Sequence, residues 1–136
     1  MIFDTKIALI IRSDLETWQK VNVAAFLAGG VAAEHPSCIG ESYADASGTT
    51  YSRLIGQPIL VYGADLAGLA RALERALARD VKPAVYTKEM FATTNDADNR
   101  GVVKVVERAK LDLVGIAIRA DRKTIDKIVD KLSFLK

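Results

Sequence analysis

The chain of 136 residues is poor in the side chains on which most metal and covalent chemistry depends. It holds one cysteine, Cys38, and one histidine, His35. An internal disulfide and a metal site built from several such side chains are therefore excluded. A Ser-His-Asp or Cys-His arrangement would have to use His35, and nothing near it in the sequence supports one. A solvated loop residue is the better interpretation, and we expect no metal and no cofactor.

Long apolar runs, a surplus of charge and glycine-rich phosphate loops are lacking too. No run approaches the roughly 20 residues of a membrane helix, and the short stretch Ile7–Ile11 comes too early for a signal peptide. We therefore expect a cytoplasmic protein with no membrane partner. The net charge of +2 gives no argument for nucleic acid. Neither GxGxxG nor GxxxxGK occurs, and for Gly29-Gly30 we expect a role in close helix packing.

What the sequence does hold is the composition of a globular domain, with 50% apolar and 26% charged residues. Hydrophobic periodicity alternates between strand and helix. Core strands are expected at 6–12, 57–62, 83–87 and 111–118, and two short strands around 42–44 and 51–54. This order predicts one compact α/β domain over residues 1–136, with three layers and a small mixed sheet flanked by helices.

The expected helices follow the core strands. The first carries Trp18, Val21, Ala25, Ala28 and Ala32 at helical spacing and ends near Gly29-Gly30 or at His35-Pro36. Asp65 and Asp121 are the expected N-caps of the second and the last helix. Another helix opens at Asp98 or Asn99.

Polar residues at strand ends are the candidate site, because ligands of open α/β sheets bind beyond the carboxyl ends of strands. The candidate ligand-binding residues are Arg12, Asp14, Asn22, Tyr86, Thr87, Thr93, Asn99 and Arg100. They converge on one cleft if the first and third core strands are neighbours. The alternative is that Asp14, Thr93 and Asn95 only cap helices and turns.

Each candidate type has a role in the cleft hypothesis. Arg12 or Arg100 would hold an anionic group bidentately. Asp14 or Glu89 would act as a general base if burial raised its pKa. Asn22 and Thr93 would orient a polar substrate.

Two basic rows recur every four residues on expected helices. They consist of Arg71, Arg75 and Arg79, and of Lys123, Lys127 and Lys131. Each row would lie along one helix face and track a phosphate backbone. Glu74, Asp126 and Asp130 are interspersed, which is typical of an ordinary solvated face. Nucleic acid therefore stays an open partner that this signal does not favour.

Several segments together resemble one bacterial family, the domain of unknown function 2000, over nearly the whole chain. They are RSDL at 12–15, WQKVNVAAFLAGG at 18–30, QPILV at 57–61, VYTKEMFAT at 85–93, NDADNR at 95–100, DLVGIAIR at 112–119 and Asp126-Lys127. That family is similar in fold to the archaeal and eukaryotic type of peptidyl-tRNA hydrolase. The resemblance implies this architecture, including homodimers among its partners, and brings no established activity.

The working residues of that enzyme carry over poorly. Phe26 stands where the enzyme has a glutamine, and Gly29 where it has a histidine. Its lysine falls near Lys20 or Asn22. Lys88 or Glu89 takes the place of its aspartate, and Thr93 alone matches, as its threonine. A scaffold altered in this way favours another substrate or none.

Three functions stay open. The leading hypothesis is a ligand-binding protein or cryptic enzyme with a small-molecule ligand. The second is hydrolysis of an ester on tRNA. The third is an oligomeric assembly or adaptor protein in which Trp18, Phe26 and Phe91 are interface anchors, although we expect at least two of these rings to pack in the core.

Overall fold

The strands of the computed structural model, which describes residues 2–136, follow the apolar segments of the sequence. They are β1 Thr5–Arg12, β2 Tyr43–Ala44, β3 Thr50–Tyr51, β4 Ile59–Ala64, β5 Ala84–Thr87, β6 Leu113–Asp121 and β7 Ser133–Phe134. The helices are α1 Thr17–Glu34, α2 Leu66–Ala78, α3 Asp96–Lys104 and α4 Arg122–Ile128, with 3-10 turns η1 Pro36–Cys38, η2 Lys88–Ala92 and η3 Arg108–Lys110. None of the helices within residues 2–136 has the length and apolar character to cross a membrane.

The main sheet has five strands in the order β5-β6-β1-β4-β7. β1 is parallel to β4 and antiparallel to β6, and β6 is antiparallel to β5. The predicted mixed sheet is confirmed, with β7 as an additional edge strand antiparallel to β4. β1 and β5 run in the same direction, so their carboxyl ends meet one edge of the sheet. They are not neighbours, however, because β6 lies between them.

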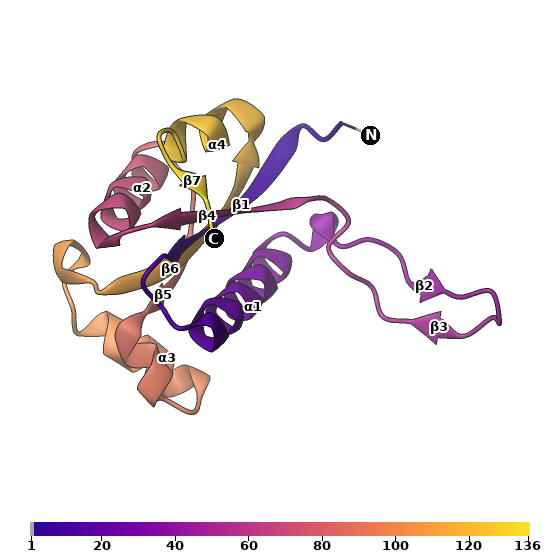
Figure 1. Cartoon of the computed structure of the whole chain (residues 1–136), viewed down its shortest axis with the longest axis horizontal. Coiled ribbons are helices and arrows are strands. Elements are labelled where there is room, and N and C mark those ends of the chain that lie inside the picture. The colour runs from indigo at the N-terminus through magenta and orange to yellow at the C-terminus, as the bar shows by residue number, and fades with distance from the viewer. Residues whose placement is uncertain (1) are drawn as a thin grey trace.

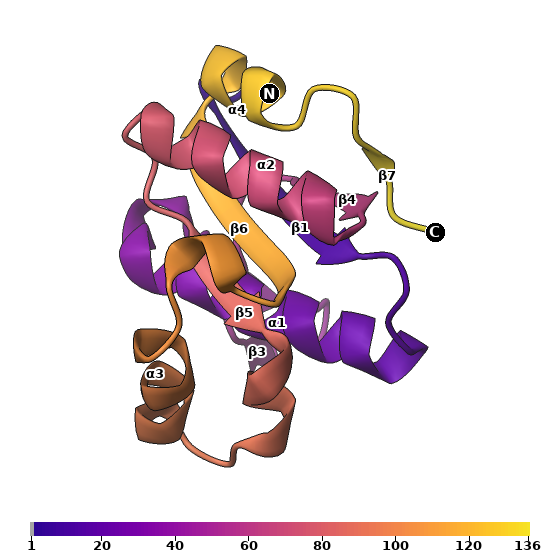
Figure 2. The same cartoon turned by 90° about the vertical axis from the view of Figure 1, so that its left-hand side faces the viewer.

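Helices cover both faces of this sheet, as Figures 1 and 2 show, with α1 on one side and α2 and α4 on the other. β1 serves both layers, since successive strand residues point to opposite faces. Ile7, Leu9 and Ile11 join the core beneath α1, whereas Ala8 and Ile10 join the core beneath α2 and α4. This explains the uninterrupted apolar run, which is typical of a strand buried on both faces. The flanking of a mixed sheet by helices is therefore confirmed.

Helix α1 buries a different face from the one predicted. Its buried side chains are Val23, Leu27 and Val31, whereas 62% of Trp18 and 64% of Val21 are exposed. Periodicity failed here because α1 carries apolar residues around most of its circumference, so spacing alone did not select the core face.

The ends of α1 and α2 show which local signals were correct. α1 continues past Gly29-Gly30 and ends at Glu34, before His35-Pro36. Gly30 does lie against the sheet, since a Cβ there would be 3.3 Å from Cβ of Ala84, while nothing lies within 4 Å of the same position at Gly29. Asp65 caps α2 as predicted, accepting a hydrogen bond from the backbone N–H of Gly68 (2.8 Å).

The predicted cap of the last helix is confirmed, whereas the predicted start of α3 is corrected. Asp121 caps α4, accepting from the backbone N–H of Thr124 (3.1 Å). α3 begins earlier than predicted, because the cap is Asn95, which accepts from the backbone N–H of Asp98 (2.8 Å). An Asn side chain at this position satisfies an N–H that has no partner within the helix.

The predicted pair of short strands forms an arm, β2–β3, that projects from the body (Figure 1). Every residue from 41 to 54 is exposed. The arm closes at a narrow neck, where the N–H of Gly40 donates to the carbonyl of Leu54 (2.8 Å) and the N–H of Gly56 to that of Cys38 (2.7 Å). The two glycines touch there, since a Cβ at Gly56 would be 3.3 Å from Cα of Gly40.

Candidate functional site

A cavity of about 330 Å³ lies between α1, η2 and the segment that leads into α3. Its lining residues are Trp18, Asn22, Phe26, Tyr86, Met90, Phe91, Thr93, Thr94, Asn95, Asp96 and Asn99. We call this cavity the aromatic pocket. It contains four of the candidate residues, namely Asn22, Tyr86, Thr93 and Asn99.

Four rings, each in contact with the next, form one wall of the aromatic pocket. Tyr86 lies 5.3 Å from Phe91 and 5.8 Å from Phe26 between ring centroids, and Phe91 lies 5.8 Å from Trp18 in an edge-on arrangement. Trp18 and Phe26 are 62% and 57% exposed. The expectation that at least two of Trp18, Phe26 and Phe91 pack in the core is therefore wrong.

The α1 side of the pocket follows from helical spacing. Trp18, Asn22 and Phe26 are four residues apart, so they form a row on one face of α1. That row lies beside the core face of Val23 and Leu27, which places the helix firmly on the sheet while the aromatic row stays open to solvent. The spacing of these three residues shows from the sequence that they share a face of α1, although not that this face is open to solvent.

Apart from the carboxylate of Asp96, the polar side chains that line the pocket are neutral. The hydroxyl of Tyr86 donates a long hydrogen bond to Oδ1 of Asn22 (3.5 Å), and burial raises the pKa of Tyr86, so the phenol keeps its proton. Oγ1 of Thr93 donates to the carbonyl of Met90 (2.9 Å) and contacts the side-chain amide of Asn99. The pocket thus offers an amide and hydroxyl groups between aromatic surfaces.

Arg12 and Asp14 do not line the pocket. The guanidinium of Arg12 donates to Asp112 (2.8 Å), to the carbonyl of Leu113 (3.0 Å) and to Asp14 (3.0 Å). Arg12 therefore joins the end of β1 to the start of β6 and is neutralised by the chain's own carboxylates. The hydrogen bond from Arg12 lowers the pKa of Asp14, which is opposite to what a general base at Asp14 needs.

Thr87 and Arg100 also lie outside the pocket lining. Thr87 is 1% exposed, and within residues 2–136 its hydroxyl has no hydrogen-bond partner. Arg100 is exposed and forms an ion pair with Asp96 one turn earlier on α3. The capping alternative holds for Asn95, whereas Asp14 caps no helix, because Glu16 is the N-cap of α1.

Two further side chains singled out in the sequence occupy ordinary positions. Cys38 is buried in the core beneath α1. His35 lies at the junction of α1 and η1. Within the described part of the chain, no three His, Cys, Asp or Glu side chains gather as metal ligands would.

The fold and the aromatic pocket together define an α/β protein with a mixed sheet and a pocket of aromatic and mostly neutral polar side chains at one sheet edge. The family model described as protein of unknown function (DUF2000) matches residues 5–136, and the chain belongs to this family. A solved structure of a protein of unknown function, Atu0240 from Agrobacterium tumefaciens strain C58, is 44% identical to the chain. The match covers 99% of this chain and 100% of that one, with a TM-score of 0.96. None of the curated proteins matches.

Proposed function

We propose that the aromatic pocket binds a small ligand with a flat ring and a neutral hydrogen-bonding edge. The observation that carries this proposal is the exposure of Trp18 and Phe26, which leave more than half of their surfaces in solvent beside Tyr86 and Phe91. Large apolar rings exposed around a polar interior are typical of binding sites. A planar ligand would stack on these rings and regain the burial they lack.

The polar lining supports a neutral rather than a charged ligand. Asn22 and Asn99 each offer an amide that donates and accepts, and the Tyr86 hydroxyl bonds to Asn22 only at 3.5 Å. A ligand amide or ring nitrogen placed between the Tyr86 hydroxyl and the Asn22 amide would replace this weak contact with shorter hydrogen bonds to both groups. Asp96 is engaged by Arg100, so charge in the lining is balanced within the chain.

Ester hydrolysis on a scaffold similar to peptidyl-tRNA hydrolase is the second candidate function. It is favoured by one observation, namely that Thr93, which matches the threonine of that enzyme, lies in the aromatic pocket together with Asn22. Its test is release of the peptide from a peptidyl-tRNA by the purified chain and by an Asn22→Ala, Thr93→Ala double variant. We expect no turnover above background, and turnover lost in the double variant would replace our leading proposal.

Trp18 makes the leading proposal measurable without a label, because it is the single tryptophan of the chain and lines the pocket. Tryptophan emission is titrated with nicotinamide and with adenine, two neutral heteroaromatic probes. We expect saturable changes for at least one probe, and a loss of about tenfold in affinity, about 1.4 kcal/mol, for Phe26→Ala and for Asn22→Ala. Tyr43→Ala, which removes an exposed ring from the arm, is the matched control and should leave the titration unchanged.

The same variants separate ligand binding from the adaptor alternative. If the exposed rings anchor a second copy, Phe26→Ala lowers the oligomer mass in sedimentation. Emission that neither probe changes, with a mass that depends on Phe26, would refute the small-ligand proposal.

A further inference from the structure

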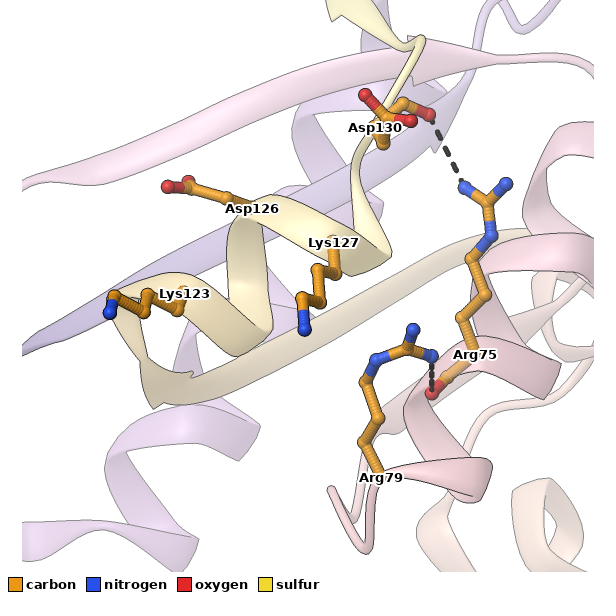
Figure 3. Close-up of a pocket in the computed structure, with 6 residues that line it drawn as sticks. All are labelled: Arg75, Arg79, Lys123, Asp126, Lys127 and Asp130. Carbon is orange, nitrogen blue, oxygen red and sulfur yellow. Dashed lines mark hydrogen bonds between the residues drawn. The ribbon is translucent and has the colours of Figure 1, made fainter.

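A second concavity lies on the opposite face of the sheet from the aromatic pocket, between α2 and α4 (Figure 3). It measures about 490 Å³ and is open to solvent along its length. Its lining residues are Arg75, Arg79, Lys123, Asp126, Lys127 and Asp130. We call it the basic groove. The two basic rows of the sequence thus meet in space, each supplying two cations to one groove.

The arginines of the groove are held by backbone atoms rather than by carboxylates. Arg75 donates to the carbonyls of Ile128 (3.4 Å) and Asp130 (3.3 Å). Arg79 donates to the carbonyl of Arg75 (3.0 Å). Carbonyl oxygens orient a guanidinium without cancelling its charge, so both side chains remain full cations with donors to spare.

The ion pairs within residues 2–136 involve none of Arg75, Arg79 and Lys127. Asp126, which precedes Lys127 in the sequence, forms an ion pair with Lys6 of β1 (2.5 Å). Figure 3 shows its carboxylate turned away from Lys127. Glu74 of α2 pairs with Arg108 (2.8 Å). Asp126 and Glu74 are therefore paired with cations outside the groove, while Asp130 also lines it.

Helix dipoles explain only part of this arrangement. Arg75 and Lys127 occupy the last turns of α2 and α4, where a cation is stabilised by the carbonyl end of the helix. That effect accounts for one cation on each helix. It does not account for Arg79, which lies beyond the last turn of α2 and lines the same groove as Lys127. The groove thus has four cations against the two carboxylates of Asp126 and Asp130, so its net charge favours an anion.

The groove is also rigid enough to be a site. α2 buries Leu69, Ala72 and Ala76, and α4 buries Ile125 and Ile128, all in one core against the sheet. The cations therefore project from two helices whose relative position is fixed by packing. Such preorganisation lowers the entropy cost of binding.

We propose that the basic groove binds linked phosphate groups, as in a di- or triphosphate. A guanidinium fork binds phosphate oxygens bidentately, and a lysine ammonium adds a point charge. A chain of phosphates matches the groove because Arg75, Arg79 and Lys127 are spread along it rather than clustered at one point (Figure 3). Lys123 extends the same lining toward the start of α4, where it also faces Asp121.

The test is isothermal titration with inorganic tripolyphosphate at low salt, repeated at higher salt. The chain should bind it, with an affinity that falls as salt screens the charges. An Arg79→Ala, Lys127→Ala double variant should lose about tenfold or more in affinity. Both side chains are exposed, so the variant keeps its fold, and an unchanged circular dichroism spectrum verifies this.

A Lys104→Ala, Lys110→Ala double variant is the matched control, since it removes the same charge from exposed positions outside the groove. Binding equal in both double variants, or no binding by the unaltered chain, would overturn the proposal. A single-stranded oligonucleotide identifies the source of the phosphates. If it competes more strongly than tripolyphosphate at equal phosphate, the groove takes a phosphodiester backbone, and if it competes less, a free polyphosphate. This titration does not use Trp18 emission, so failure of the phosphate proposal would leave the small-ligand proposal for the aromatic pocket unaffected.

Discussion

The contact between α1 and the sheet rests on Gly115 of β6, and a single methyl group there tests it. A Cβ at Gly115 would lie 2.6 Å from Cγ1 of Val23 and 2.8 Å from Cδ1 of Leu27. Both partners are essentially fully buried. In the sheet, Gly115 is paired with Tyr86 on one side and Ile11 on the other. Gly115→Ala therefore forces Val23 and Leu27, and with them this part of α1, to shift next to the aromatic pocket.

The size of the effect follows from the two close contacts. Overpacking of a dense core costs about 1–3 kcal/mol, and we take about 2 kcal/mol because both contacts are with the ends of side chains that can rotate. For a chain of this length that corresponds to a fall in Tm of roughly 6–10 °C. The displacement of α1 also moves Asn22 relative to Tyr86, so Trp18 emission should change in the folded variant.

Thermal and urea unfolding followed by circular dichroism measure this change. Gly101→Ala is the matched control, because a Cβ at Gly101 meets no atom within 4 Å inside α3, and it should stabilise by about 0.5–1 kcal/mol. In a Val23→Ala background the cost of Gly115→Ala should shrink, since the closest contact is gone. An unchanged Tm for Gly115→Ala, or strict additivity with Val23→Ala, would refute the close approach of α1 and β6.

Two further predictions concern a cap and a charge. Asp65→Ala removes the N-cap of α2 and should lower the free energy of unfolding by about 1 kcal/mol in urea titrations, whereas an unchanged midpoint would show that the cap bond to Gly68 contributes nothing. The hydrogen bond from Arg12 lowers the pKa of Asp14 in the folded state below its unfolded value of 3.8. The Asp14 carboxylate therefore stabilises the fold above pH 3.8, and this stabilisation is lost as the pH falls through the folded pKa. Asp14 is 71% exposed, so the effect is about 0.2–1 kcal/mol. Asp14→Asn should lower the free energy of unfolding by that amount at pH 7 and lose less stability than the unaltered chain as the pH falls below 4; a steeper acid dependence in the variant would contradict the assignment.

The sequence predicted the secondary elements well where the signal was local. The run Ile7–Ile11 identified the central strand, and Asp65 and Asp121 identified two helix starts, because caps and strands are local signals. It missed β7, whose two residues, Ser133 and Phe134, form a strand only by pairing with β4. Such a strand has no periodicity of its own.

The candidate site was predicted in part for a topological reason. Asn22 and Tyr86 meet because β1 and β5 run in the same direction, which strand-end reasoning anticipates without knowing the order of strands. That Arg12 lies outside the aromatic pocket could not be foreseen, because its partner, Asp112, is a hundred residues away in sequence. The spacing of the apolar residues did not show which face of α1 is buried. The exposure of the Trp18 and Phe26 rings depends on that face, so it could not be predicted either.

The neck of the β2–β3 arm has a consequence for the plasticity of the chain. Gly40 and Gly56 already hold the two ends of the arm together by backbone hydrogen bonds, so the entropy of closing that loop is offset at the neck and depends only weakly on what lies beyond it. The exposed segment beyond the neck can accordingly be shortened, lengthened or exchanged while the sheet and both of its helical layers keep their geometry. We therefore expect the arm to accept new sequence, such as an inserted tag or a foreign recognition loop.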